Sequence, residues 1–417
     1  MAVPLHVLAV ALVNSTWMAS QFILPVIVRR EFKANDFETL LITASPVIFF
    51  SLSIFWNDFF KRTAFGKYLW IYWLVACLPM VLVSGAHSYW MVLVPHILAC
   101  IGGAGYHPAA ADLLNHLYPA VSRGRWYGII LSTSMALGAG AGIGIGEWME
   151  GNNQAFRYYL PLIVVLQAFG LILMAWLSRR SGHNERRELT TSDPRTIWAR
   201  VVEPVTHMKE VLRADPVFAR YEAGYMVYGV GWMICYALLP HIITDKLQLP
   251  YDSAARSTYV TYQIVMCLAY WPAGLLMDKL GAIRSTGLSF LLLTLYPIGL
   301  IFTTGSGDLT FVSAWYGLAH AGASVGWTLG PVALAPSKDK VAQYVAIHAT
   351  MVGIRGKVFQ GLGVLLYWVS SGLGLPLALA AIGFLYSSFI MFKLHGSVQA
   401  RLRAKSEQAL LEKVDIT

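Results

Sequence analysis

An arginine and a histidine stand seven residues apart in an otherwise apolar stretch. Arg355 and His348 lie within residues 342–369, and this spacing places both on one face of a helix. A guanidinium in apolar surroundings can hold a carboxylate or phosphate through two parallel hydrogen bonds. Arg355 therefore predicts a binding site for an anionic solute. The alternative is a permanent ion pair with an acid on a neighbouring helix.

Four ionisable residues in apolar stretches are candidates for carrying a proton. They are His107, Glu222, His320 and His348. Ionisable groups are costly inside a bilayer, and histidine gains and loses a proton near physiological pH. Structural explanations stay open: His320 could donate to a carbonyl, His107 could satisfy a backbone kinked at Pro108, and Glu222 could be a helix-end charge.

Aromatic and amide side chains recur at helical spacing near these groups. Tyr228 and Trp232 stand four residues apart, as do Tyr316 and His320. Such rings could face the organic part of a solute, or they could be packing between helices. We predict a solute site formed by Arg355 with Asn14, Gln21, Tyr228, Trp232, Tyr262, Gln263, Tyr316 and Trp327.

Motifs for catalysis, nucleotide binding and metal binding are absent from the sequence. There is no GxxxxGK[ST], HExxH or paired CxxC string, and the one GxSxG match, at 322–326, lies inside a long apolar run and not at a strand-to-helix turn. The four cysteines all lie in apolar runs and are interpreted as small core residues. We therefore expect no cofactor, no metal and no enzymatic activity, and energy for any transport must come from a gradient.

The elements that position these residues are long apolar helices. Of the 417 residues, 57% are hydrophobic and 13% are charged, against about 25% charged in soluble domains. A span needs roughly 20 apolar residues. We predict twelve spans in an all-α membrane protein, at 5–28, 37–56, 68–86, 90–117, 126–148, 157–178, 218–243, 254–277, 285–304, 309–335, 342–369 and 373–393.

One long polar segment divides the chain. It predicts an N-terminal six-helix bundle at 1–178, a connector at 179–216, a second bundle at 217–394 and a tail at 395–417. Most Lys and Arg residues fall in the connector, the tail and the loops on their side. The positive-inside rule then places both termini in the cytoplasm of an inner-membrane protein. Arg29 and Arg30 are an exception, balanced either by nearby acids such as Asp36 or by anionic lipid.

The two halves repeat a loop string. Residues 274–284 read GLLMDKLGAIR and residues 58–67 read DFFKRTAFGK, with their aspartates 220 positions apart. The first of these resembles the G-x-L-x-D-R-x-G-R-like signature of the major facilitator superfamily. The segment 105–108, GYHP, with the RGR string at 123–125, is similar to the fosmidomycin-resistance branch. The glycine-rich stretch 138–146 lacks the proline that antiporter-type members carry.

The resemblance implies a twelve-helix fold of two bundles around a central site. It also implies a gating role in conformational switching for the loop aspartates Asp58 and Asp278. A carboxylate at a helix end can pair with loop cations such as Arg284, and breaking that pair helps the domains move.

These observations predict a secondary transporter that moves a small organic, anionic solute by alternating access with proton coupling. We expect a monomer in the lipid bilayer, with small-molecule and proton partners and no nucleic acid. The alternatives are an exporter of amphipathic drugs or metabolites, and a non-transporting membrane sensor or assembly factor. The sensor would need a folded loop domain, whereas the longest loop is short and charged.

Overall fold

The computed structural model describes residues 2–61, 63–118, 120–182, 197–337 and 340–414, and the regular elements of these residues are all helical. In the N-terminal half they are α1 (Ala2–Glu31), α2 (Asp36–Phe50), α3 (Ser53–Lys61), α4 (Phe65–Tyr72), the π-helical turn η1 (Trp73–Cys77), α5 (Pro79–Val83), α6 (Tyr89–Gly103), α7 (Tyr106–Leu117), α8 (Ala120–Gly151) and α9 (Phe156–Arg180).

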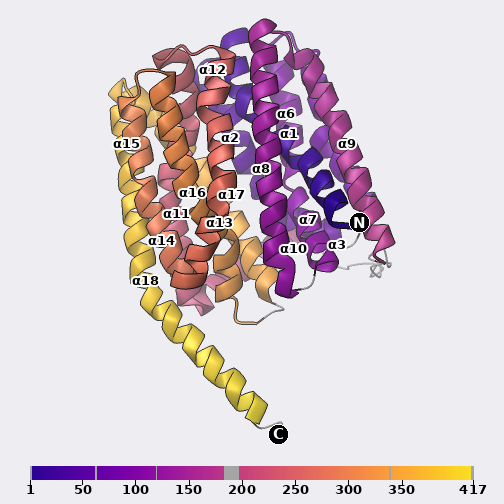
Figure 1. Ribbon diagram of the computed structural model, residues 1–417, viewed down its shortest axis with the longest axis vertical. Coiled ribbons are helices and arrows are strands. Elements are labelled where there is room, and N and C mark those ends of the chain that lie inside the picture. The colour runs from indigo at the N-terminus through magenta and orange to yellow at the C-terminus, as the bar shows by residue number, and fades with distance from the viewer. Residues whose placement is uncertain (1, 62, 119, 183–196, 338–339, 415–417) are drawn as a thin grey trace.

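A separate helix, α10 (Ile197–Ala214), lies within the predicted connector. The C-terminal half contains α11 (Pro216–His241), η2 (Ile242–Lys246), α12 (Tyr251–Ala255), η3 (Arg256–Val260), α13 (Thr261–Leu280), α14 (Ala282–Leu293), α15 (Leu295–Phe302), α16 (Ser306–Leu334), α17 (Val341–Ser370) and α18 (Gly374–Val414). Helix α18 runs without a break past residue 394, where a separate tail was expected, and projects beyond the other helices (Figure 1).

Seven helical segments in the described part of the chain are long and apolar enough to cross a membrane. They are Phe65–Val83, Ile129–Gly151, Phe156–Arg180, Pro216–Lys246, Tyr251–Met277, Ala282–Phe302 and Gly374–Val398. Two shorter apolar helices, Val3–Asn14 and Tyr89–Gly103, fall below that length. The chain is thus an all-helical, multi-pass membrane protein, and the count of twelve spans stays a prediction.

Two proline residues each leave one backbone carbonyl without its helical hydrogen-bond donor, and a polar side chain from another helix donates to that carbonyl instead. Pro46 has no N–H, so the carbonyl of Ile42 loses its helical donor. The buried His96 lies 3.0 Å from that oxygen and supplies the missing hydrogen bond through Nε2. At Pro108 the orphaned carbonyl is that of Ala104, and Ser53 Oγ donates to it at 2.9 Å.

Two predicted spans are interrupted: one just before Pro108, and one at residues 51–52, since α2 continues through Pro46 to Phe50. The predicted span 90–117 is divided between α6 and α7, and the span 37–56 is divided between α2 and α3. The helical period of 3.6 residues does not continue through such an interruption. Residues on its two sides that the period would place on one helix face can therefore point in different directions. His96 accordingly is buried, whereas His107 is exposed.

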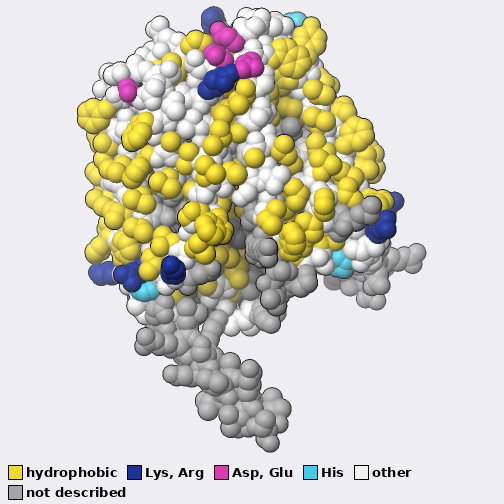
Figure 2. All heavy atoms as spheres, viewed as in Figure 1, with side chains coloured by type: hydrophobic (Ala, Val, Ile, Leu, Met, Phe, Trp, Pro, Cys, Tyr) yellow, Lys and Arg dark blue, Asp and Glu magenta, His cyan; other side chains and the backbone are white. Residues whose placement is uncertain are grey.

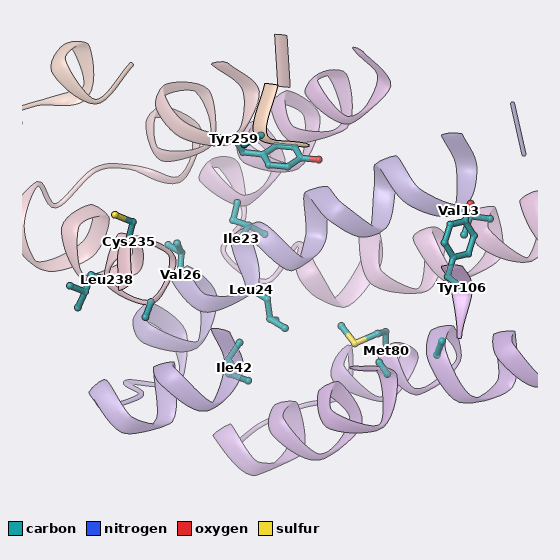
Figure 3. Packing of buried hydrophobic residues seen from close by; sticks show 14 of the residues in the cluster. Val13, Ile23, Leu24, Val26, Ile42, Met80, Tyr106, Cys235, Leu238 and Tyr259 are labelled. Atoms are coloured by element: carbon teal, nitrogen blue, oxygen red, sulfur yellow. The ribbon is translucent and has the colours of Figure 1, made fainter. Parts of the chain in front are cut away.

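Helices of each half pack mainly on their own half and meet the other half along two seams. Helix α1 packs on α8 and α9, and α11 packs on α17 and α18. Across the halves, α2 packs on α17, and α8 packs on α12 and α13. One buried cluster crosses between the halves, with Val26 of α1, Ile42 of α2 and Leu238 of α11 among its members (Figure 3).

Hydrophobic side chains cover most of the outer face between two polar edges. Figure 2 shows Asp and Glu side chains together with Lys or Arg at the upper edge of the visible face, and Lys, Arg and His side chains along its lower edge. Trp271, Phe302 and Phe311 are each more than seven-tenths exposed, which water would penalise and lipid would not. This distribution is typical of a protein surrounded by a bilayer.

Candidate functional site

A carboxylate and an imidazole are buried against each other between α11 and α17. His348 Nδ1 lies 2.9 Å from Glu222 Oε1 and 3.0 Å from Oε2, and both side chains are almost fully buried. The ring of Tyr225 meets His348 edge-on at 4.7 Å, and Trp327 lies 5.3 Å from it. His348 Nε2 has no hydrogen-bond partner among the described residues. Glu222 is therefore a member of a buried pair and not a solvated charge at a helix end.

Arg355 lies two helical turns further along α17 and is 1% exposed. Its Nη1 donates to the backbone oxygen of Tyr225 at 2.9 Å. The guanidinium carbon lies 5.8 Å, 5.6 Å and 5.9 Å from the ring centres of Tyr225, Tyr228 and Trp232. No carboxylate of the described residues forms an ion pair with Arg355, and its Nε is unbonded. The acid on the neighbouring helix pairs with His348 instead.

Gly229 of α11 makes room for the Arg355 side chain. A Cβ atom at this position would lie 2.5 Å from Arg355 Cδ, closer than any ordinary contact. Gly229→Ala is therefore expected to displace Arg355 from its contacts with the surrounding rings and to lower the free energy of unfolding by about 1–3 kcal/mol. Thermal unfolding in detergent measures the change.

Gly140→Ala is the matched control, because a Cβ atom at Gly140 would meet nothing within 4 Å. Alanine is favoured over glycine inside a helix, so this variant should be neutral or slightly more stable. Equal melting temperatures for the two variants would mean that Gly229 is not needed to accommodate Arg355.

A second polar contact lies among rings on α13 and α16. The hydroxyl of Tyr262 lies 2.8 Å from His320 Nδ1, and the ring of Tyr316 stacks on His320 at 5.0 Å. Trp232 lies 6.0 Å from His320 and thereby connects this group with Arg355. Tyr262, Tyr316, His320 and Trp232 are all partly exposed.

The three predicted amide residues lie apart from this cluster. The amide nitrogen of Gln263 donates to the Tyr259 hydroxyl at 2.6 Å, and the side chain faces α8. Gln21 is buried with neither amide atom hydrogen-bonded, and Asn14 is partly exposed. Tertiary packing thus groups Arg355 with rings of α11 and α16, and no contact between described residues joins Gln21 or Asn14 to it.

His107 occupies a different environment from the buried histidines. Its side chain is exposed, and its ring meets Phe50 of α2 edge-on at 4.9 Å. Ser53, and not His107, supplies the hydrogen bond that Pro108 removes from the backbone.

An ion-pair network joins the two halves at one end of the molecule; we call it the Arg29 network. Its members are Arg29, Asp36, His241, Asp245 and Trp368. Arg29 of α1 donates to Asp36 of its own half at 2.9 Å and to Asp245 of the other half. His241 Nε2 lies 3.1 Å from Asp36, and the indole of Trp368 donates to Asp36 at 2.7 Å.

Asp36 stays ionised in this network. Burial raises the pKa of Asp36, but hydrogen bonds from Trp368 and Arg29 and the positive charges nearby outweigh it, so the pKa lies below its usual value. A carboxyl with a lowered pKa loses its interactions only when pH falls through that lowered pKa. The Arg29 network is therefore ionic at neutral pH.

A second set of polar contacts between the halves lies at the same end; we call it the Tyr251 network. Its members are Glu31, Glu147, Glu150, Tyr251 and Arg256. Glu150 accepts from the Tyr251 backbone N–H at 2.7 Å, and the Tyr251 hydroxyl donates to Glu31 at 3.0 Å. Every hydrogen bond and ion pair that joins the halves through side chains the structure describes belongs to this end.

Comparison with known proteins places this arrangement in a family. The sequence model of the Major Facilitator Superfamily matches residues 7–366. The chain belongs to the major facilitator superfamily. It is therefore a secondary transporter and not an enzyme. Among curated proteins it is similar to the multidrug resistance protein MdtH of Sodalis glossinidius (strain morsitans), with 26% identity over 339 residues, 78% of this chain and 75% of the relative.

Solved structures of other transporters share the fold. A POT family transporter in complex with 5-aminolevulinic acid superimposes with a TM-score of 0.77 at 11% identity, covering 95% of this chain and 96% of that one. A peptide transporter POT in complex with sulfate gives a TM-score of 0.76 at 11% identity, covering 95% and 94%. At this identity the likeness concerns the fold alone.

The superfamily loop residues lie at the end opposite the Arg29 network. Asp58 is in α3 and Asp278 in α13, but their side chains lie outside what the structure describes. Arg284, near the start of α14, is exposed. Their gating role stays a prediction.

Sequence reasoning missed most of the residues that join the halves in this transporter. It noted that Asp36 could balance Arg29, but not that Asp245 and His241, more than 200 residues away, complete the network. The one feature of the sequence that could have indicated this network is the pair of charges Asp245 and Lys246 at the end of an apolar stretch. The same pair is equally typical of a solvated helix end.

Proposed function

We propose that this transporter moves a small organic anion together with protons by alternating access. The observation that carries the proposal is Arg355, a buried cation that forms no ion pair with the described residues, near the buried Glu222–His348 pair. The proposal includes twelve spans in two six-helix bundles of an inner membrane, with both termini, the connector and the tail in the cytoplasm. The Arg29 network would then face outward.

The anionic character of the solute follows from the cost of an unpaired guanidinium. Removing a charge from water costs several kcal/mol unless a counter-charge and hydrogen bonds compensate. Arg355 contacts one carbonyl and three ring faces, and the nearby Glu222 carboxylate is hydrogen-bonded to His348 and not to Arg355. A carboxylate or phosphate on the solute would supply the missing counter-charge and an acceptor for Nε. The solute would reach this buried group when neighbouring rings move.

Proton coupling follows from the position of the Glu222–His348 pair. Without an added proton the pair contributes a negative charge near Arg355. A proton bound there removes that net charge, so the field at Arg355 becomes more favourable to an incoming anion. Proton and anion would then each strengthen the binding of the other. His320, hydrogen-bonded to Tyr262, is the second coupling candidate.

A thermal-shift screen of the purified transporter tests the proposal. The panel contains organic anions, cations and neutral drugs, each at pH 5.5 and pH 7.5. Ligands that bind the native state raise the melting temperature by mass action. Anions are expected to raise it, and more strongly at the lower pH. A panel in which no anion shifts the melting temperature at either pH would contradict the proposal.

The networks at the Arg29 end support alternating access, because the halves must separate there when that end opens. Asp245→Asn removes the cross-half charge partner of Arg29. An exposed ion pair contributes up to about 1 kcal/mol, so the open population should rise roughly fivefold. The readout is the rate at which an impermeant maleimide labels Thr43→Cys, which lines a pocket between α1, α2 and α11. Cys267→Ala removes the partly exposed native thiol.

Asp308→Asn is the matched control for this experiment. Asp308 lies at the same end, but its carboxylate accepts from the neighbouring Thr304 of its own half, at 2.9 Å and 2.7 Å. Labelling in this variant should match that of the parent. An unchanged labelling rate in Asp245→Asn would show that the Arg29 network does not hold this end closed.

The second candidate function is export of amphipathic compounds. It is favoured by the curated relative, whose name is that of a multidrug resistance protein, and by the partly exposed rings of α11, α13 and α16. In the thermal-shift screen this function predicts that cationic or neutral amphiphiles stabilise the protein and that anions do not.

A further inference from the structure

Six rings from four helices of the C-terminal half form one row with nearly parallel planes. In order they are Phe290, Tyr228, Trp232, His320, Tyr316 and Tyr296. Successive planes differ by 16°, 23°, 30°, 10° and 24°. Aromatic pairs in cores adopt both stacked and edge-on arrangements. In this row every pair of neighbouring ring planes lies within 30° of parallel, so a flat ring that joined the row could lie parallel to its neighbours.

The two ends of the row are buried and its middle is open. Phe290, Tyr228 and Tyr296 are buried, whereas Trp232, His320 and Tyr316 are partly exposed. Trp232 is also the most loosely stacked member, with centroid distances of 6.1 Å to Tyr228 and 6.0 Å to His320. The other neighbours in the row stand 4.3–5.0 Å apart. The row is therefore most easily opened beside Trp232, where a further ring would have to insert.

Polar groups stand on both sides of this open position. His320 Nδ1 is bonded to the Tyr262 hydroxyl, and its Nε2 has no partner among the described residues. On the other side, the Arg355 guanidinium carbon lies 5.9 Å from the Trp232 ring. A ring beside Trp232 thus lies within reach of a hydrogen-bonding imidazole and of a cation that forms no ion pair with the described residues.

We propose that the transported solute is a planar aromatic or heteroaromatic acid. Its ring would insert beside Trp232, in the partly exposed middle of the row, and its carboxylate or phosphate would bind Arg355 as the Trp232 ring shifts. The inference rests on the anion transport proposed above and adds the class of the organic part. Stacking distinguishes a flat ring from a saturated ring of similar size and equal charge, which gains burial but not the face-to-face contact.

The test compares two matched pairs of acids on the purified full-length protein. They are benzoate with cyclohexanecarboxylate, and 2-naphthoate with decahydro-2-naphthoate. The quantity measured is the concentration that gives half of the maximal rise in melting temperature. The aromatic member is expected to need roughly tenfold less than its saturated partner. Trp232→Leu is expected to reduce this ratio to below about threefold.

Trp271→Leu is the matched control, since Trp271 is 75% exposed on the same half and is not part of the row. It should keep the tenfold ratio. Tyr316→Leu removes the next open ring and replaces the Trp232 variant if that protein does not fold. Arg355→Gln should weaken both members of each pair equally, because it removes the anion contact and leaves the row in place.

The outcomes separate this inference from the anion-transport proposal. Equal binding of both members of each pair, lost in Arg355→Gln, would overturn the aromatic class and leave anion transport standing. A tenfold ratio that survives Trp232→Leu would overturn the assigned ring position. If neither acid of either pair shifts the melting temperature while cationic or neutral amphiphiles do, both proposals fail.

Discussion

Arg355→Gln is expected to weaken the binding of anionic solutes by at least about a hundredfold, because each hydrogen bond to a charged group contributes about 1.5–3 kcal/mol and the fork supplies two. Glutamine can still donate to the carbonyl of Tyr225, so the packing between α11 and α17 should persist. The measurement is the concentration dependence of uptake into proteoliposomes, together with that of the thermal shift.

Two variants on the same helix sharpen this result. Arg355→Lys keeps the charge but not the planar fork, and it is expected to recover only part of the affinity. Lys357→Gln removes a cation two residues away whose side chain is exposed, and it should leave uptake unchanged. If Arg355→Gln leaves the binding and uptake of every anion unchanged, the guanidinium only packs against the neighbouring rings. The exporter function then becomes the better explanation.

Glu222→Gln is expected to abolish solute accumulation driven by a pH gradient while leaving solute exchange at equal pH on both sides. A neutral amide can keep a hydrogen bond to His348 but cannot take up a proton at physiological pH. Glu222→Ala is expected to be far more disruptive, because breaking a buried pair leaves its partner uncompensated at a cost of about 3–5 kcal/mol.

Proteoliposomes loaded at one pH and diluted into another separate the two activities of Glu222→Gln. Accumulation ratio measures coupling, and counterflow measures exchange. Asp308→Asn, an acid outside the pair and fully at the surface, serves as the comparison and should behave as wild type. Accumulation that persists in Glu222→Gln would move the coupling role to another group, with His320 the next to test.

Local chemistry in the sequence pointed to several residues of the site but not to their partners. Arg355 and His348 were recognisable because charged groups stand out in an apolar stretch, and their spacing placed them on one face. The pairing of His348 with Glu222 joins positions 126 apart, and nothing in either helix alone specifies it. For the same reason, the amides of Gln21 and Gln263 looked equivalent to the ring residues although they lie elsewhere.

The sequence by itself determined that the chain is a helical membrane protein with a duplicated loop and buried ionisable groups. Hydrophobic periodicity and charge placement are local properties, and the bilayer constrains them strongly. Only the tertiary structure decided which buried charge stays unpaired, which rings form a row and which end is tied by ion pairs. These depend on how helices from distant parts of the chain cross, and on breaks such as the one between α6 and α7 before Pro108.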